Sequence, residues 1–327
     1  MENVTIPAKS DNYLIVRNIP DTLSIDSLEC AIDVFLSFQQ VNHNTPDTYK
    51  RALRVFFRGW VYRTGRTIAN LTRADLLAFI QDMKAENKSP NTINSYLTAI
   101  RRFYAFCELN GITKDIAKGI KRVPTTSGEE YEKSDFTPTQ AANILTVTEN
   151  NKRDFAIMSL MMRCGLRTIE VVRANVGDII LDGDTYVIKV FGKRDKKRDV
   201  TLTTKTWAAI NDYLTSERRG AKDNDPLFVA VSNRSKGERM TTRSVSRIAK
   251  DSIRATGIND SRHTAHSCRH TALGCIVSKS NADPNKMQDA QLLAGHTDPA
   301  TTWIYVKQQA HRDYKRRAPN QIIYTLF

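Results

Sequence analysis

The chain has 327 residues, and its 49 Lys and Arg outnumber its 35 Asp and Glu to give a net charge of +14. This length is enough for two domains with separate cores, and the charge favours a polyanionic partner such as nucleic acid. No apolar run approaches the ~18 residues of a membrane span and no signal peptide opens the chain, so we expect a cytoplasmic protein without a membrane partner.

Residues 1–21 predict a short N-terminal extension, with one candidate strand at 13–19. Residues 22–123 predict a helical domain, because apolar side chains recur there at helical spacing. Thr72 and the pair Ser89-Pro90 have the residue types that begin a helix. The segments with helical spacing are Leu28–Phe38, Tyr49–Trp60, Leu76–Met83 and Ile93–Phe103.

Positive charge is concentrated in this first domain. Residues 47–123 hold fifteen Lys and Arg against six Asp and Glu. Helices with such faces can lie along a DNA duplex and contact its phosphates, although charge alone fits ordinary solvated helix faces equally well. The candidate DNA contacts in this domain are Lys50, Arg51, Arg54, Arg58, Arg101 and Arg102.

Residues 124–134 have the composition of an exposed linker, and residues 135–327 predict a second domain that includes the C-terminal tail. The apolar run 155–162 predicts a buried helix that Gly165 ends, with a new helix near Thr168. Arg167 then lies at a junction between helices. Glu170 would share its face and could orient the guanidinium, but an Arg and a Glu three residues apart are more often a solvated pair.

Residues 184–202 contain two β-branched runs on either side of a charged turn, which predicts a β-hairpin. The turn is dense in positive charge. A lysine there could protonate a departing alkoxide, or the turn could only grip phosphate backbone. Its cations are Lys193, Arg194, Lys196, Lys197 and Arg198.

The segment 266–270 reads His-Ser-Cys-Arg-His, and it is followed by Gly295-His296 and by Tyr305 nine residues after that histidine. These are the groups needed to cut a phosphodiester with a protein side chain. Arginine binds the non-bridging oxygens, tyrosine is a nucleophile, and histidine can accept the proton of a phenol whose ordinary pKa is about 10.

Two alternatives apply to this segment. Zinc could be considered because histidines and cysteines crowd residues 263–275, but their spacing matches no zinc motif, so we expect no metal site. The sequence Arg-His-Thr-Ala also occurs twice, from Arg262 and from Arg269. Only the second copy has a histidine three residues before its arginine, because Asn259 precedes the first, and we therefore assign the second copy.

In order along the chain stand Gly-Leu-Arg-x-x-Glu, Gly-Lys in a hairpin, His-x-x-Arg-His, Gly-His and a tyrosine nine residues later. This ordered set resembles the tyrosine recombinase family, the phage-type integrases and Xer-type recombinases, over residues 135–305. Cys268 and Ala294 stand where the family more often has leucine. Neither position carries one of the groups needed for the reaction.

The resemblance implies a mostly α fold with a small β-hairpin or sheet: an N-terminal helical core-binding domain followed by an α+β catalytic domain. It implies that Arg167 and Arg269 clamp the scissile phosphate and that Lys193 is the general acid on the leaving 5′ oxygen. His266 would be the base or proton relay, and Glu170 would support the site. It also implies that His296 hydrogen-bonds the phosphate and that Tyr305 forms a 3′-phosphotyrosyl bond, with no metal or nucleotide cofactor.

The hypothesis from sequence is a site-specific DNA recombinase that acts as a tetramer on two duplex sites, near the nucleoid. It would integrate or excise a mobile element or resolve DNA dimers, with or without an accessory directionality factor. Arg194, Lys196 and Lys197 would hold DNA phosphates, and the apolar tail 321–327 would dock on a neighbouring protomer. Alternatives are a type IB topoisomerase-like or telomere-resolving enzyme, and a catalytically silent DNA-binding accessory protein.

Overall fold

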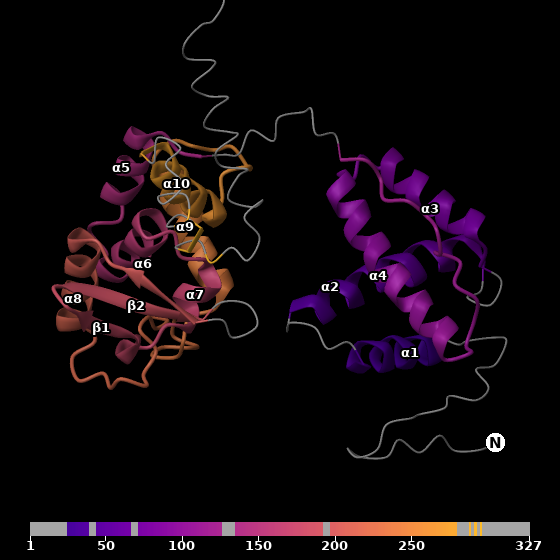
Figure 1. Ribbon diagram of the computed structural model, residues 1–327, viewed down its shortest axis with the longest axis horizontal. Coiled ribbons are helices and arrows are strands. Elements are labelled where there is room, and N and C mark those ends of the chain that lie inside the picture. The colour runs from indigo at the N-terminus through magenta and orange to yellow at the C-terminus, as the bar shows by residue number, and fades with distance from the viewer. Residues whose placement is uncertain are drawn as a thin grey trace, which may run out of the picture. The chain divides into compact units, whose positions relative to one another are not determined.

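The computed structural model describes residues 25–38, 44–66, 71–125, 135–191 and 197–279, together with residues 288, 291, 292 and 295. The chain divides into two compact units, Met1–Glu130 and Tyr131–Phe327 (Figure 1). The candidate strand at 13–19, the hairpin tip at 192–196 and the tail lie outside the described residues. The finer domain boundaries at residues 21, 123 and 134 stay predictions.

The four helices predicted for the first unit are confirmed. Their apolar faces enclose an aromatic core in which Phe35, Phe57 and Phe103 contact one another edge to face or stack on further rings. Such ring pairs stabilise a core by more than the burial of their surface area alone would. The helices are α1 (Ile25–Phe38), α2 (Asn44–Arg54), α3 (Arg73–Ala85) and α4 (Pro90–Leu109).

The second predicted helix departs from regular α geometry. After α2 the chain winds as a π-helix, η1 (Val55–Val61), and ends in a short 3₁₀ turn, η2 (Tyr62–Thr64). Its buried side chains come in pairs four residues apart, at 52 and 53, 56 and 57, and 60 and 61. In an α-helix, four residues make slightly more than one turn, so each pair would be rotated about 40° from the pair before it. The π turn is wider and rotates less per residue, which offsets this drift away from the core.

Local hydrogen bonds fix the helix ends and the last segment of this unit. Thr72 forms the predicted cap of α3, with the Asp75 carboxylate accepting from the Thr72 N–H at 2.8 Å, and Ser89 caps α4. Buried Asn94 donates to the carbonyl of Val123 and accepts from its N–H, both at 2.8 Å. The segment after α4 is thereby held against the helices.

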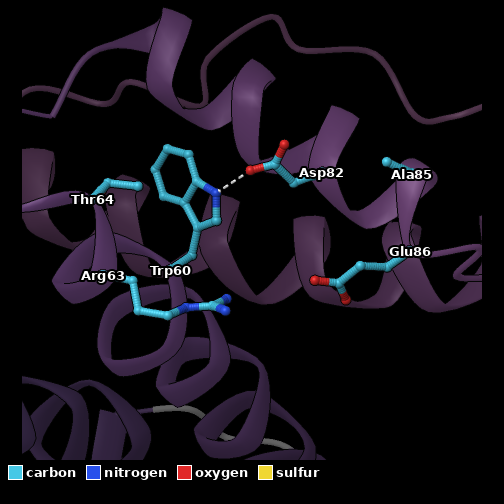
Figure 2. A pocket seen from close by; sticks show the side chains of 6 residues that line it. All are labelled: Trp60, Arg63, Thr64, Asp82, Ala85 and Glu86. Carbon is cyan, nitrogen blue, oxygen red and sulfur yellow. Dashed lines mark hydrogen bonds between the residues drawn. The ribbon is translucent and has the colours of Figure 1, made fainter.

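A shallow pocket lies in the first unit where η1 and η2 meet the end of α3 (Figure 2). The indole of Trp60 lines it, and Trp60 Nε1 donates a hydrogen bond to Asp82 Oδ2 at 2.6 Å. Arg63 and Glu86 stand at its rim. This hydrogen bond joins the π-helix to α3.

The second unit is built around α6 (Lys152–Arg163), the buried helix predicted at 155–162. Ile157, Met158 and Leu160 are fully buried, and α6 contacts helices on several sides. The other helices of this unit are α5 (Pro138–Thr146), α7 (Thr168–Arg173), α8 (Thr204–Glu217), α9 (Thr242–Ala255) and α10 (Ala265–Lys279), with a 3₁₀ turn, η4 (Val176–Asp178) (Figure 1).

The predicted hairpin is confirmed as β2 (Thr185–Phe191) and β3 (Lys197–Thr201), which pair antiparallel with Ile188 opposite Val200. A further strand, β1 (Ile179–Asp182), pairs with β2 to give the order β1-β2-β3. Ile188, Val190 and Val200 are buried in the core. The architecture is therefore mostly helical with a small antiparallel sheet in the second unit.

Candidate active site

Arg167 stands at the turn between α6 and α7. Gly165 adopts a left-handed conformation there, with φ of 66°, which glycine accepts without strain. A Cβ on Gly165 would stand 3.4 Å from the Cβ of Ala272, so α10 packs close to this turn. The turn places Arg167 at the N-cap of α7, one position before the helix begins.

Glu170, in the first turn of α7, is 1% exposed. Its Oε2 accepts from the Arg167 backbone N–H at 2.8 Å, and its Oε1 accepts from Arg167 Nη1 at 2.9 Å. Arg167 and Glu170 therefore form the pair that their spacing suggested. Because the carboxylate is buried, this is not the usual solvated pair.

Arg198, on β3, is the second arginine that binds this carboxylate. Its Nη1 donates to Glu170 Oε1 at 2.8 Å and its Nη2 donates to Oε2 at 2.9 Å. In the sequence, Arg198 stands only among the cations of the charged turn, and this contact was not predicted. Side chains alternate faces along a strand, so the inward-facing Val200 was the available signal that Arg198 also points inward.

Arg269, on α10, is the third arginine, and it is 1% exposed. Its Nη1 donates to the carbonyl oxygen of Gly165 and lies 4.0 Å from Glu170 Oε2. Arg262, in the other copy of the repeated sequence, instead pairs with Asp260 at an exposed turn. Of the two copies, the structure brings the second to the carboxylate.

The charges of this cluster do not cancel. Burial alone would raise the pKa of Glu170, but the hydrogen bonds and charge of Arg198, followed by those of Arg167, lower it below its ordinary value. The carboxylate is therefore ionised at neutral pH. Three guanidinium groups around one carboxylate leave an excess of two positive charges, which favours binding of an anion.

His266 is exposed on the first turn of α10, three residues before Arg269. Its ring stands perpendicular to that of His270, with centroids 4.2 Å apart. His263 differs, because its ring stacks on Phe136 and its Nδ1 is buried. Of these histidines, His266 is the one with an exposed side chain.

Lys193, His296 and Tyr305 lie outside the described residues, as do Arg194 and Lys196. Gly295, which precedes His296, is described. A Cβ on Gly295 would stand 3.0 Å from Nη1 of Arg198, so the backbone immediately before His296 lies against this arginine.

The candidate DNA contacts of the first unit differ in their surroundings. Arg51, Arg54 and Arg58 are exposed at spacings of three and four residues, and Arg102 is also exposed, whereas Arg101 is half-buried. Lys50 donates to Asp33 Oδ1 at 2.5 Å, so it is already engaged by a carboxylate.

In the second unit, exposed Lys197 lies over the ring of Phe191, 5.4 Å from its centroid.

Within the part of the chain that the structure describes, no cluster of three or more His, Cys, Asp or Glu is arranged to hold a metal ion. Nor, among the same residues, is there a helix with the length and apolar character needed to cross a bilayer.

Two family models match the chain. The model of the phage integrase family covers residues 134–312, which includes every candidate catalytic residue. The chain belongs to the phage integrase family. Residues 34–111 match the N-terminal SAM-like domain of phage integrases. The protein is a tyrosine-type site-specific recombinase built from these two domains.

Individual relatives agree with this assignment. The tyrosine recombinase XerC of Caldanaerobacter subterraneus is 28% identical over 309 residues, with 85% of this chain and 82% of the relative covered. A solved XerH recombinase bound to palindromic difH DNA shares the fold at a TM-score of 0.70 and 19% identity, over 90% of this chain and 84% of that one. A lambda integrase tetramer bound to a Holliday junction shares it at 0.67 and 16%, over 87% and 77%.

The ionised state of Glu170 can be tested by stability. Because its pKa is lowered on folding, its contribution is fully present above the ordinary value of 4.5 and is lost as the pH falls through the lowered value. Glu170→Gln should destabilise the second unit by about 3–5 kcal/mol at neutral pH, since it leaves buried guanidinium charge without its partner. Calorimetric melting at a series of pH values measures this.

The melting temperatures of Glu170→Gln and the unsubstituted protein should converge as the pH falls below 4.5. The exposed Glu238, substituted by Gln, is the matched control and should change little at any pH. A difference for Glu170→Gln that stays constant from neutral to acid pH would mean that the carboxylate is not ionised in the folded protein.

Proposed function

We propose that the Glu170 cluster is the phosphate-binding part of the recombination site, in which Tyr305 cuts one DNA strand and forms a 3′-phosphotyrosyl intermediate. The observation that carries this proposal is the convergence of Arg167 and Arg269 on one buried, ionised carboxylate with positive charge in excess. A phosphodiester under attack gathers negative charge on its non-bridging oxygens. Two fixed guanidinium groups stabilise that charge without reorganising.

The step balances within the protein and the DNA. Tyr305 Oη attacks phosphorus while the bond to the 5′ oxygen breaks, so one phosphodiester replaces another. His266, whose side chain is exposed, takes or relays the phenol proton. Lys193 gives a proton to the leaving 5′ oxygen, and His296 donates a hydrogen bond to the phosphate. Attack by a 5′ hydroxyl of another strand reverses the step, and no metal or nucleotide is needed.

The first unit holds the duplex in this proposal. Arg51, Arg54 and Arg58 present one exposed basic face of α2 and η1, which suits contacts to successive phosphates. Arg101 and Arg102 add charge on α4. In the second unit, Arg194, Lys196 and Lys197 would grip backbone beside the scissile bond. These phosphate contacts supply affinity and register but carry no sequence information directly.

The assembly that fits this chemistry is a tetramer on two duplex sites, since exchange requires cuts in both duplexes. The structurally similar lambda integrase tetramer on a Holliday junction supports it. The apolar tail 321–327 would dock on a neighbouring protomer. The biological outcome is resolution of DNA dimers or movement of a mobile element, in the cytoplasm at the nucleoid, with an accessory directionality factor where one direction is favoured.

Tyr305→Phe tests the nucleophile. It should abolish the covalent adduct with a nicked suicide duplex and leave DNA binding nearly unchanged, because it removes one hydroxyl from a protein bound by many phosphate contacts. Two sets of duplexes are used. One carries the inverted repeats that flank the gene, and the other carries randomised repeats. Tyr314→Phe and Tyr324→Phe are the controls and should still form the adduct. An adduct with Tyr305→Phe would refute the assignment.

Lys193→Ala tests the general acid. It should slow cleavage of ordinary DNA by about 10²- to 10⁴-fold and recover most of that loss when the leaving 5′ oxygen is replaced by sulfur, since a thiolate needs no proton. Lys196→Ala and Lys197→Ala should lose affinity for both substrates alike. If sulfur restores cleavage to either of these, the acid is that lysine; if it restores none, the acid lies outside the hairpin.

The ion pair of Lys50 predicts a difference between two neighbouring cations. Arg51→Ala should reduce the slope of log affinity against log salt by about one, as for a lost phosphate contact. Lys50→Ala should reduce it less, because Asp33 competes with DNA for the ammonium group. Gel-shift titrations over a range of salt concentrations measure both slopes. Equal reductions would show that DNA displaces Asp33.

A further inference from the structure

We infer that Arg198 is a positioning residue of the recombination site: by filling acceptor sites of Glu170, it fixes how Arg269 and the guanidinium of Arg167 lie relative to the scissile phosphate. This inference rests on the proposed function of the cluster. It concerns a residue outside the six proposed to act on the phosphate or on its protons.

The hydrogen bonds on Glu170 fill all of its acceptor positions. An ionised carboxylate offers about four lone-pair positions, two on each oxygen. Oε1 accepts from Nη1 of Arg198 and from Nη1 of Arg167. Oε2 accepts from Nη2 of Arg198 and from the backbone N–H of Arg167. All four positions are occupied, and Arg198 occupies two of them.

Arg269 is left outside this set. Its Nη1 lies 4.0 Å from Glu170 Oε2, beyond hydrogen-bond distance, and donates instead to the Gly165 carbonyl. If Arg198 were removed, two acceptor positions on a buried carboxylate would open beside Arg269 and Arg167. Both guanidinium groups would be drawn further onto Glu170, because an unsatisfied buried charge is costly. Fewer of their donors would then face the phosphate.

The surroundings of Arg198 favour this role over a direct grip on DNA. Its side chain is 14% exposed against 29% for Arg167, and both of its terminal nitrogens point at Glu170. The backbone of Gly295, which leads into His296, lies close to the same guanidinium. Arg198 therefore contacts both the carboxylate and the turn before a proposed phosphate ligand.

A double-mutant cycle separates the two roles. Single-turnover cleavage of the nicked duplex is measured at saturating DNA for the unsubstituted protein, Arg198→Ala, Glu170→Gln and the double variant. If Arg198 acts through Glu170, Arg198→Ala alone should slow cleavage by about 10²-fold, the cost of a misplaced clamp, and should leave affinity unchanged. In the Glu170→Gln background it should have little further effect.

A direct phosphate contact would give another result. Arg198→Ala would then slow cleavage equally in both backgrounds and would reduce the salt dependence of binding, and either outcome overturns the inference. Should Arg198→Ala fail to fold, Arg198→Lys replaces it, since lysine keeps the charge but cannot bind both oxygens as a planar fork. Arg198→Lys that cleaves as fast as the unsubstituted protein would also overturn it.

The pH profile adds a measurement that a purely structural role would not change. Arg198 lowers the pKa of Glu170, so Arg198→Ala should raise it and shift the acid limb of the cleavage rate to higher pH. Arg239→Ala is the matched control, because Arg239 binds the carbonyls of Val172 and Ala174 at the end of α7. It should lower the melting temperature and leave the acid limb in place. An unshifted limb in Arg198→Ala contradicts the inference.

Failure of the proposed function would look different. In that case Tyr305→Phe would form the covalent adduct as the unsubstituted protein does, or neither would form it. The pH dependence of melting in Arg198→Ala, which needs no DNA, would still report whether Arg198 holds Glu170.

Discussion

A buried, ionised carboxylate organises the second unit. Glu170, on α7, would be unstable in the interior without positive partners, and it receives them from the residue before α7 and from β3 and α10, two elements far from it in sequence. The requirement to satisfy one charge therefore fixes the relative positions of these elements. It also leaves more positive charge than the carboxylate neutralises, and in the proposed function this excess stabilises the charge of the reacting phosphodiester.

Sequence patterns predicted the features that depend on neighbouring residues. Helical spacing and cap residues gave the helices of the first unit, the apolar run and Gly165 gave α6 and its end, and β-branched runs gave the hairpin. The pairing of Arg167 with Glu170 was also a local prediction, three residues apart. Each of these depends on backbone geometry within one or two turns of chain.

Features that depend on tertiary contacts were missed. The bond from Arg198 to Glu170 spans 28 residues, and nothing in the charged turn distinguished this cation from its neighbours except strand alternation. The π-helix follows from how the buried pairs of side chains between Ala52 and Val61 meet the core, whereas spacing alone predicted a regular helix. The ion pair of Lys50 with Asp33 joins two helices, so charge counts along the sequence treated Lys50 as free to bind DNA.

A crystal structure of Tyr305→Phe bound to its DNA site, with the scissile phosphate intact, tests the central claim most directly. The account predicts that Arg167 and Arg269 each donate to non-bridging oxygens of that phosphate, while both terminal nitrogens of Arg198 stay on the Glu170 carboxylate. A structure in which Arg198 leaves Glu170 and binds the phosphate, or in which the phosphate lies away from the Glu170 cluster, would contradict it.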